Sequence, residues 1–185
     1  MEDAAQLGCD ALVNCTGIGA SKLCDDSSIV GARGILLNYD RASCKRRTFV
    51  HDTTGDVMVN DVVLMSDEPP WGSETEPCYI IPRGTILAVG GSYLEGDDTA
   101  KEIRPEERKR LLNNAWNLGI DVEESAPVAE WTNFRPVRKT VRCEIDTTVG
   151  ELEGVRVVHN YGHGGSGWTV NAGAAKEVAR LLGHD

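Results

Sequence analysis

The sequence lacks long hydrophobic runs and has few basic residues relative to its acidic ones. No uninterrupted apolar stretch approaches the roughly 18 residues that a membrane-spanning helix requires. Only 19 Lys and Arg residues stand against 29 Asp and Glu residues, so the formal net charge is -10. Nucleic acids and anionic membrane surfaces are bound through basic patches, so this composition argues against both. Small molecules and other proteins remain as partners.

Targeting signals and paired cysteines are also missing. The first residues have neither the basic nor the apolar segment of a secretory signal, and the final Gly183-His-Asp is not a Ser-Lys-Leu-type peroxisomal tripeptide. The six cysteines contain no C-x-x-C pair, and several lie in apolar stretches. We therefore expect reduced core thiols rather than disulfides, in an intracellular protein that is either cytoplasmic or peroxisomal.

Hydrophobic patterning predicts short strands and two helices, which gives an α/β or α+β fold. A helix is expected at 105–118, with Pro105 in its first turn and Gly119 after its end. A second is expected at 168–182, with one buried apolar face formed by Val170, Ala174, Val178 and Leu181. Strands are expected at 11–15, 34–39, 47–51, 56–64, 78–82, 85–93, 141–145 and 155–158. The strands at 78–82 and 85–93 form a hairpin that turns at Arg83 and Gly84, whereas 66–77 is an exposed, proline-interrupted loop.

The most unusual segment is His159-Asn-Tyr-Gly-His-Gly-Gly-Ser-Gly-Trp-Thr169, in which four of the six residues from Gly162 to Gly167 are glycine. Glycines at this density let the backbone approach a flat or anionic ligand, and the N-terminus of the following helix adds positive partial charge. The alternative is a tight strand-to-helix turn, which requires only one or two glycines. His159 and His163 have a metal-binding spacing only on a helix, so we interpret them as hydrogen-bonding or core histidines and predict no metal site.

Two further segments contain candidate binding residues. Arg135 lies beside Pro136 between apolar neighbours, which predicts a guanidinium held in one pose to bind a carboxylate, or alternatively an internal salt bridge. The turn from Gly17 to Lys22 resembles half of a dinucleotide-binding fingerprint, with Asp40 as the acid for the ribose. Lys22 occupies the position of the third glycine, and too few residues precede Gly31 for a full helix, so a small Rossmann dehydrogenase is the weakest hypothesis.

In order along the chain, VNCTG at 13–17, YIIP at 79–82, GGSY at 90–93, FRPVR at 134–138 and HNYGHGG at 159–165 resemble the D-amino-acid oxidase family. The resemblance covers almost the whole chain and implies FAD as cofactor. It also implies transfer of the substrate Cα hydrogen as hydride, with oxygen as oxidant and hydrogen peroxide as product. No side-chain base is implied, because the amine binds neutral and the substrate is aligned for reaction.

The resemblance also implies roles for particular residues. Arg135 corresponds to the arginine that binds the substrate carboxylate, Tyr79 to the tyrosine that supports the same group, and Tyr93 to a second tyrosine of the fungal branch. The backbone carbonyl of Gly165 would accept from the substrate amine. The vertebrate lid tyrosine corresponds to Thr75, so no such lid is expected. FAD-binding positions are Thr16, Gly17, Gly164, Gly165, Gly167, Trp168 and Thr169. Of these, Gly164, Gly167, Trp168 and Thr169 would lie along the pyrimidine edge of the flavin.

Tyr93 bears on the choice of substrate. D-Aspartate oxidases typically have arginine at this position, so a tyrosine favours neutral D-amino acids. Arg83 could supply the missing charge, which keeps D-aspartate oxidase open as an alternative.

The G-x-G-x-x-G turn that begins such enzymes does not precede the first motif, so the chain resembles the C-terminal part of a two-domain flavoprotein. We expect residues 1–30 to be a remnant of an FAD-binding, Rossmann-like domain. Residues 31–143 would form a substrate-binding domain with a mixed or antiparallel sheet, and 144–185 would return to the FAD-binding domain. The missing half could be a complementing N-terminal chain, and a homodimer is possible. The competing hypothesis is a non-catalytic remnant that acts as a binding or interaction module.

Overall fold

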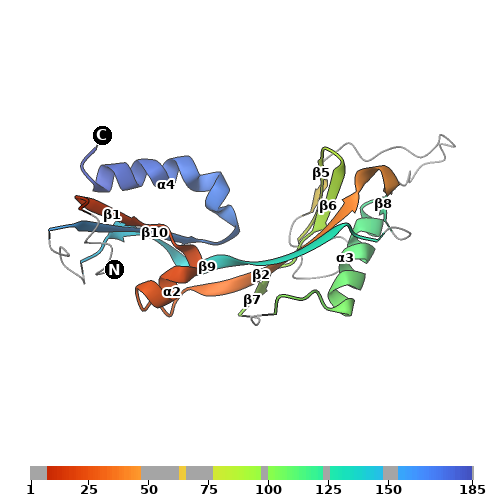
Figure 1. The fold of residues 1–185 in the computed structure, drawn as a ribbon, viewed down its shortest axis with the longest axis horizontal. Coiled ribbons are helices and arrows are strands. Elements are labelled where there is room, and N and C mark those ends of the chain that lie inside the picture. Colours follow the sequence, from red (N-terminus) through yellow and green to blue (C-terminus); the bar gives the residue numbers. More distant parts are fainter. Residues whose placement is uncertain are drawn as a thin grey trace. The chain divides into compact units, whose positions relative to one another are not determined.

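The computed structural model describes residues 8–46, 63–65, 77–96, 100–122, 126–147 and 154–184 (Figure 1). The chain divides into two compact units, Met1–Ala32 with Phe134–Asp185, and Arg33–Asn133. Strands β2 (Val30–Asp40) and β9 (Ala129–Ile145) each contain residues of both units. The expected strand at 47–51, most of the one at 56–64, and the loop at 66–76 with Thr75 lie outside the described residues.

The first unit contains a mixed sheet. Strand β1 (Ala11–Asn14) pairs in parallel with β10 (Arg156–His163), and β10 pairs antiparallel with β9. A 3₁₀ turn η1 (Gly17–Gly19) and the short helix α2 (Ala20–Leu23) follow β1. The turn η3 (Gly164–Ser166) and helix α4 (Gly167–Leu181) follow β10. Both connections therefore leave the same edge of the sheet, because parallel strands present their carboxyl ends together.

Helix α4 begins and ends where the sequence predicts, but the prediction that its apolar face is buried is wrong. Val170 is 41% exposed, and Trp168 at the first turn is 90% exposed. Ala174, Val178 and Leu181 are only half-buried. Periodicity shows that a helix has an apolar face, but it does not show whether neighbouring elements cover that face.

The second unit is an antiparallel sheet with one helix. The sheet order is β2, β6 (Ile86–Gly90), β5 (Cys78–Arg83) and β4 (Val63–Met65), and the short β7 (Leu94–Glu95) also pairs with β2. The turn η2 (Arg41–Ser43) leads to β3 (Lys45–Arg46), which pairs with β8 (Ile120–Asp121). Helix α3 (Pro105–Asn117) packs against β5, β6 and β8. These elements confirm the predicted hairpin and helix, and the mixed α/β class of the chain.

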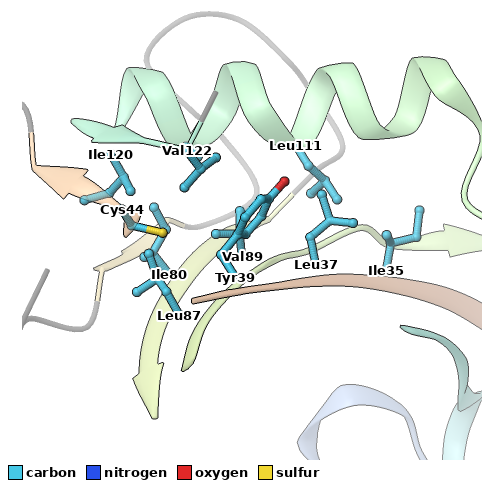
Figure 2. Packing of buried hydrophobic residues seen from close by; sticks show 11 residues of the cluster. Ile35, Leu37, Tyr39, Cys44, Ile80, Leu87, Val89, Leu111, Ile120 and Val122 are labelled. Atoms are coloured by element: carbon cyan, nitrogen blue, oxygen red, sulfur yellow. The ribbon is translucent and has the colours of Figure 1, made fainter. Parts of the chain in front are cut away.

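The core of the second unit lies between α3 and one face of the sheet. Figure 2 shows Leu111 of α3 facing Leu37 and Tyr39 of β2. The cluster is completed by further buried residues of β2, α3, β5, β6, β8 and the adjoining loops, namely Ile35, Cys44, Ile80, Leu87, Val89, Ala115, Ile120 and Val122. Period-two alternation along β2 and β6 therefore assigns their other residues to the opposite face.

A buried ion pair joins β2 to α3 below this core. Arg33 is completely buried, and its Nη1 contacts Oε1 of Glu107. Arg33 Nε also donates to the carbonyl oxygen of Ala100 at 2.9 Å, and Glu107 Oε2 accepts from the backbone N–H of Arg104 at 2.8 Å. Each charged group thus has both an ionic partner and backbone partners, which is the arrangement that a buried pair requires.

Two strand boundaries differ from those that the sequence predicts. The strand expected at 141–145 begins earlier than predicted, because Trp131–Arg138 also lies within the 17-residue strand β9. Tyr93 does not lie in β6, which ends at Gly90.

All six cysteines are free thiols, but only Cys44 and Cys78 are buried. Burial raises the pKa of the Cys78 thiol to about 12. Among the described residues, no helix has the length and apolarity to cross a membrane.

The buried ion pair predicts a large difference between two Glu→Gln substitutions. Glu107→Gln leaves the buried guanidinium of Arg33 without its counter-charge and should lower the free energy of unfolding by about 3–5 kcal/mol. Glu130→Gln removes the exposed ion-pair partner of Arg108, which lies on the same helix as Glu107. This change should lower the free energy of unfolding by less than about 1 kcal/mol. Urea unfolding followed by circular dichroism measures both. Equal effects would contradict the structural role of the buried pair.

Candidate functional site

The first part of the site is the turn that follows β1. Asn14 is buried, and its Oδ1 accepts from the Thr16 backbone N–H at 3.1 Å and from the Thr16 hydroxyl at 2.7 Å. These bonds hold Thr16 and Gly17 at the end of the strand. Gly17 has φ +57°, which glycine adopts without strain. Only four residues of helix follow at α2, so this turn does not begin a complete dinucleotide-binding unit.

The two neighbours of Arg135 pack against glycines in the same unit. A Cβ placed on Gly31 would lie 3.1 Å from Cδ1 of Phe134, and a Cβ placed on Gly17 would lie 3.5 Å from Cγ of Pro136. Both residues that flank Arg135 are therefore in close contact with backbone.

The glycine-rich turn approaches Arg135 from the end of β10. The register between β9 and β10 shifts between Tyr161 and His163, and His163 pairs with Val137. A Cβ placed on Gly165 would lie 3.4 Å from Cδ and 3.7 Å from Nε of Arg135. The stem of the arginine therefore packs against the Gly165 backbone. The structure thus brings together the predicted carboxylate-binding arginine and the predicted flavin-binding turn.

The four glycines of this turn fall into two pairs. Gly162 and Gly164 have φ of +87° and +56°, and a Cβ on Gly162 would lie only 2.8 Å from Cβ of Arg138. Local backbone conformation and packing therefore account for these two. Gly165 and Gly167 have no positive φ, and a Cβ on Gly167 would meet only Cβ of His163, at 3.7 Å. Within the described residues, neither backbone conformation nor packing requires glycine at 165 and 167.

The N-terminus of α4 follows these glycines directly. Gly165, Trp168 and Thr169 are exposed, whereas Gly164 and Gly167 are half-buried. The first turn of α4 has no side-chain cap and no acidic residue. Its backbone N–H groups therefore give positive partial charge to this end of the helix.

A cluster of four polar side chains, which the sequence did not reveal, holds the base of the turn. Asp26 Oδ2 accepts from the Tyr161 hydroxyl at 2.8 Å and from Arg138 Nε at 3.0 Å. Arg142 Nη1 donates to the Tyr161 hydroxyl oxygen at 2.7 Å, and its guanidinium lies over the Tyr161 ring. Because Tyr161 and Arg138 flank Gly162 in space, this Asp26 cluster fixes the backbone just before Gly164 and Gly165. The only sequence signal was the presence of Tyr161 and Arg138 within the family motifs.

Electrostatics keep the carboxyl of Asp26 ionised. Burial acts to raise its pKa, but hydrogen bonds from Ser28 and Tyr161 and the charge of Arg138 together hold that pKa well below its usual value. Burial also raises the pKa of the Tyr161 phenol, with the hydrogen bond to Asp26 acting in the same direction. At neutral pH the cluster therefore contains a carboxylate, a neutral phenol and two guanidinium groups.

His159 is a core histidine, as predicted. It is completely buried, with Nδ1 3.1 Å from Nδ2 of Asn14 and Nε2 2.8 Å from Oδ2 of Asp146. The oxygen of the Asn14 amide already accepts from Thr16, so its NH₂ group donates to Nδ1, and Nε2–H donates to Asp146. His163 is half-buried. Among the described residues, no group of three or more His, Cys, Asp or Glu side chains is arranged to hold a metal ion.

Tyr79 and Tyr93 belong to the second unit. Tyr79 lies on β5, and Tyr93 follows β6 in a segment where the hydroxyl of buried Ser92 donates to the Arg33 carbonyl oxygen at 3.1 Å. The remaining predicted residues, Thr16, Gly17, Arg135, Gly164, Gly165, Gly167, Trp168 and Thr169, belong to the first unit. The roles of all ten residues remain predictions.

Comparison with known proteins identifies the family. A family model described as FAD dependent oxidoreductase matches residues 2–181. The chain therefore belongs to the FAD-dependent oxidoreductase family, whose cofactor is FAD, as the motifs predicted. Within that family, two D-amino-acid oxidases that are 31% and 32% identical to this chain confirm the predicted resemblance.

The D-amino-acid oxidase of Rubrobacter xylanophilus is 32% identical over 183 residues, which cover 99% of this chain and 48% of that protein. The Streptomyces coelicolor D-amino-acid oxidase is 31% identical, over 97% of this chain and 49% of that protein. D-aspartate oxidase 1 of Caenorhabditis elegans is 29% identical, over 98% of this chain and 48% of that protein. The chain thus spans about half the length of the curated relatives it matches.

Solved structures share the fold at low identity. Iminodiacetate oxidase from Chelativorans sp. BNC1 superposes with a TM-score of 0.63 at 16% identity, covering 97% of this chain and 44% of that one. The FAD-bound L-alpha-glycerophosphate oxidase from Mycoplasma pneumoniae gives 0.64 at 14% identity, covering 95% and 43%. At sequence identities this low, the similarity shows a shared fold and nothing more.

The packing of Gly162 predicts opposite effects for two Gly→Ala substitutions. Gly162→Ala introduces a Cβ at positive φ against Arg138 and should lower the free energy of unfolding by about 1–3 kcal/mol. Gly173→Ala places a Cβ in open space within α4 and should raise it by about 0.5–1 kcal/mol. Thermal unfolding monitored by circular dichroism compares them. A destabilising Gly173→Ala, or a neutral Gly162→Ala, would refute this account of the turn.

The lowered pKa of Asp26 predicts a pH dependence of stability. The unfolded state takes up a proton near the ordinary Asp pKa of 3.8, whereas the folded state resists protonation to lower pH. The contribution of Asp26 is therefore fully present above about pH 4 and is lost as the pH falls below it. Asp26→Asn should be less stable than wild type at pH 6, and the difference should shrink as the pH is lowered toward 3. Urea unfolding at several pH values tests this, and a constant difference would contradict it.

Proposed function

We propose that this chain is the substrate-facing part of an FAD-dependent oxidase of D-amino acids. The overall reaction would convert a D-amino acid, oxygen and water into a 2-oxo acid, ammonia and hydrogen peroxide. The observation that carries the proposal is the packing of Arg135 against Gly165, with its neighbours Phe134 and Pro136 packed against Gly31 and Gly17. Family membership and the two D-amino-acid oxidase relatives support the same reaction class.

The residues around the glycine-rich turn fit a flavin. Gly165 and Gly167 leave room for a flat ligand at the N-terminus of α4, and a Cβ at either position would occupy that space. Backbone N–H groups of Gly167, Trp168 and Thr169 would face the pyrimidine edge, with Thr16 and Gly17 as further contacts. When bound, FAD supplies the acceptor for the substrate's Cα hydride and passes the electrons to oxygen. The helix N-terminus favours negative charge at this edge.

The protein side chains would bind and orient the substrate. Arg135 would form a bidentate, charge-assisted pair with the carboxylate, and the Gly165 carbonyl would accept a hydrogen bond from the amine. Two fixed contacts on either side of Cα leave one rotational position for its hydrogen, so alignment replaces an acid or base. Tyr79 would support the same carboxylate.

We propose neutral D-amino acids as the preferred substrates. Tyr93 provides no positive charge for an acidic side chain. Arg83 lies at the hairpin end of β5, four residues beyond Tyr79, which separates their backbones by about 13 Å along a strand. Tyr79 pairs with Gly90, close in sequence to Tyr93, whereas Arg83 pairs with Ile86 at the turn. Arg83 therefore lies at the other end of the hairpin, which argues against it as a substitute for an arginine at position 93. D-Aspartate oxidase is the second candidate, because D-aspartate oxidase 1 is nearly as similar to this chain as the D-amino-acid oxidases are.

The remaining contacts of FAD would come from a dinucleotide-binding half. We propose that this half is part of the same protein or a complementing chain, and that the site is intracellular, cytoplasmic or peroxisomal. The exposed Trp168 and Val170 at the first turn of α4 provide apolar surface that such a half could cover. A homodimer is a further possibility. If no such half exists, the chain would act as a non-catalytic binding module.

Substitution of Arg135 tests the proposed function. In the FAD-loaded protein, Arg135→Ala should raise KM for D-alanine on the order of a hundredfold, because it removes a charge-assisted bidentate pair. Lys139→Ala removes an exposed cation on the same strand and should leave KM unchanged. Peroxide production with D-alanine and D-aspartate measures both specificity and KM.

Three results would count against the proposal. An unchanged KM in Arg135→Ala would remove the assigned carboxylate contact. Higher kcat/KM for D-aspartate than for D-alanine would favour the second candidate. Protein that takes up no FAD, and therefore shows no flavin absorbance band even with FAD in excess, would favour the binding module.

A further inference from the structure

Tyr79 and Gly90 are direct partners across the β5–β6 hairpin. The register places Tyr79 opposite Gly90 on β6, and Leu36 of β2 opposite the other side of Gly90. Ile80 and Val89, the adjacent pair, face the core beneath α3. Because side chains alternate along a strand, Tyr79 and Gly90 share the face of the sheet that points away from that core.

The Tyr79 ring lies against the backbone of Gly90 and Gly91. A Cβ placed on Gly90 would lie 2.5 Å from Cζ and 2.6 Å from the hydroxyl oxygen of Tyr79. A Cβ placed on Gly91 would lie 2.6 Å from Cε1 of the same ring. Real Cβ atoms do not approach other heavy atoms this closely, and an aromatic ring cannot bend out of the way. The ring occupies the space that any side chain at position 90 or 91 would fill.

Backbone conformation does not explain these two glycines. Neither Gly90 nor Gly91 has a positive φ, so other residues could adopt the same backbone without strain. Glycine inside a strand also weakens it, because it has no side chain to pack and loses more entropy on folding. Contact with the Tyr79 ring is therefore the feature of the described structure that requires glycine at both positions.

The backbone of these two residues, the Gly90–Gly91 platform, is itself firmly held. Gly90 continues the ladder to β2 and β5, and the Gly91 N–H donates to the Pro77 carbonyl oxygen at 3.2 Å. The next residue, Ser92, is buried and donates to the Arg33 carbonyl oxygen. Arg33 belongs in turn to the buried ion pair with Glu107. The platform therefore cannot easily retreat from the ring.

Within the part of the chain that the structure describes, the Tyr79 hydroxyl forms no hydrogen bond, although its ring is in tight contact. The ring is thus held by shape, and the hydroxyl is available to a ligand. A rigid aromatic side chain loses little conformational entropy on binding when its rotamer is already fixed.

We propose that Gly90 and Gly91 are positioning residues, which hold the Tyr79 ring flat on the sheet and so place its hydroxyl for the substrate carboxylate. This inference rests on the proposed function of Tyr79. Any side chain at position 90 would lift the ring and move the hydroxyl with it. The two glycines then act on substrate binding without touching the substrate.

The ring position can be measured without activity. The chain contains four tyrosines, so 3-fluorotyrosine labelling gives four ¹⁹F resonances, and Tyr79→Phe identifies the one from Tyr79. In Gly90→Ala this resonance should shift while those of Tyr39, Tyr93 and Tyr161 stay in place. Gly173→Ala, whose Cβ meets open space, should leave all four unchanged. An unshifted Tyr79 resonance in Gly90→Ala would overturn the platform.

Kinetics of the FAD-loaded protein test the role in substrate binding. Gly90→Ala should raise KM for D-alanine roughly tenfold or more, with a smaller change in kcat, because a hydrogen bond to a charged group is displaced. Tyr79→Ala should show a similar KM, and Gly90→Ala in the Tyr79→Ala background should add nothing further. Additive effects of the two substitutions would show that Gly90 acts otherwise than through Tyr79.

A folding defect would not obscure the result. If Gly90→Ala fails to fold, the Gly90→Ala/Tyr79→Ala double variant should fold again, because the clash is gone. A double variant that is also unfolded would overturn the inference. Failure of the wild-type flavoprotein to oxidise any D-amino acid would overturn the proposed function and with it the role in catalysis. The ¹⁹F comparison separates that outcome from a failure of the platform itself.

Discussion

Excluded volume at glycine is the constraint on which the rest of this structure depends. Two predicted substrate-binding side chains, Arg135 and Tyr79, and the neighbouring Pro136 each pack against the backbone of a glycine. Gly165 receives the stem of Arg135, Gly17 receives Pro136, and Gly90 receives the ring of Tyr79. A methyl group at Gly90 would clash with the aromatic ring, whereas one at Gly165 or Gly17 would reach van der Waals contact with the arginine stem or the proline ring. Backbone without side chains therefore sets the positions of the groups that would bind substrate.

Buried polar contacts hold those glycines in place. In the first unit, the Asp26 cluster restrains the backbone around Gly162. His159 accepts a hydrogen bond from Asn14 and donates one to Asp146, so it links β10 to β1 and to the residue that follows β9. In the second unit, the ion pair of Arg33 with Glu107 supports the segment that follows Gly91. Such networks are costly to leave half-satisfied, which makes them effective at selecting one arrangement.

This arrangement is suited to a reaction that needs alignment rather than acid or base chemistry. The ionisable cluster around Asp26 consists of groups that stay in one charge state at neutral pH, so it provides support rather than proton transfer. The proposed substrate contacts, Arg135, Tyr79 and the Gly165 carbonyl, all act by hydrogen bonding to fixed positions. An enzyme of this kind depends on the precision of its scaffold, and the glycine contacts are where that precision is set.

The sequence by itself determined the family, the cofactor, helix α3, the hairpin of β5 and β6, and the set of residues to examine. The family and the cofactor follow from the resemblance of the motifs to known enzymes. The helix and the hairpin follow from spacing, turn residues and local periodicity, which depend on neighbours a few positions away. It did not reveal that β9 runs continuously through Arg135, that the apolar face of α4 is exposed, or which glycines serve packing. Only the tertiary structure decided these points, because the partners are remote: 74 residues separate Arg33 from Glu107, and 135 separate Tyr161 from Asp26. Contacts over such distances arise from the packing of whole elements, and no local pattern specifies them.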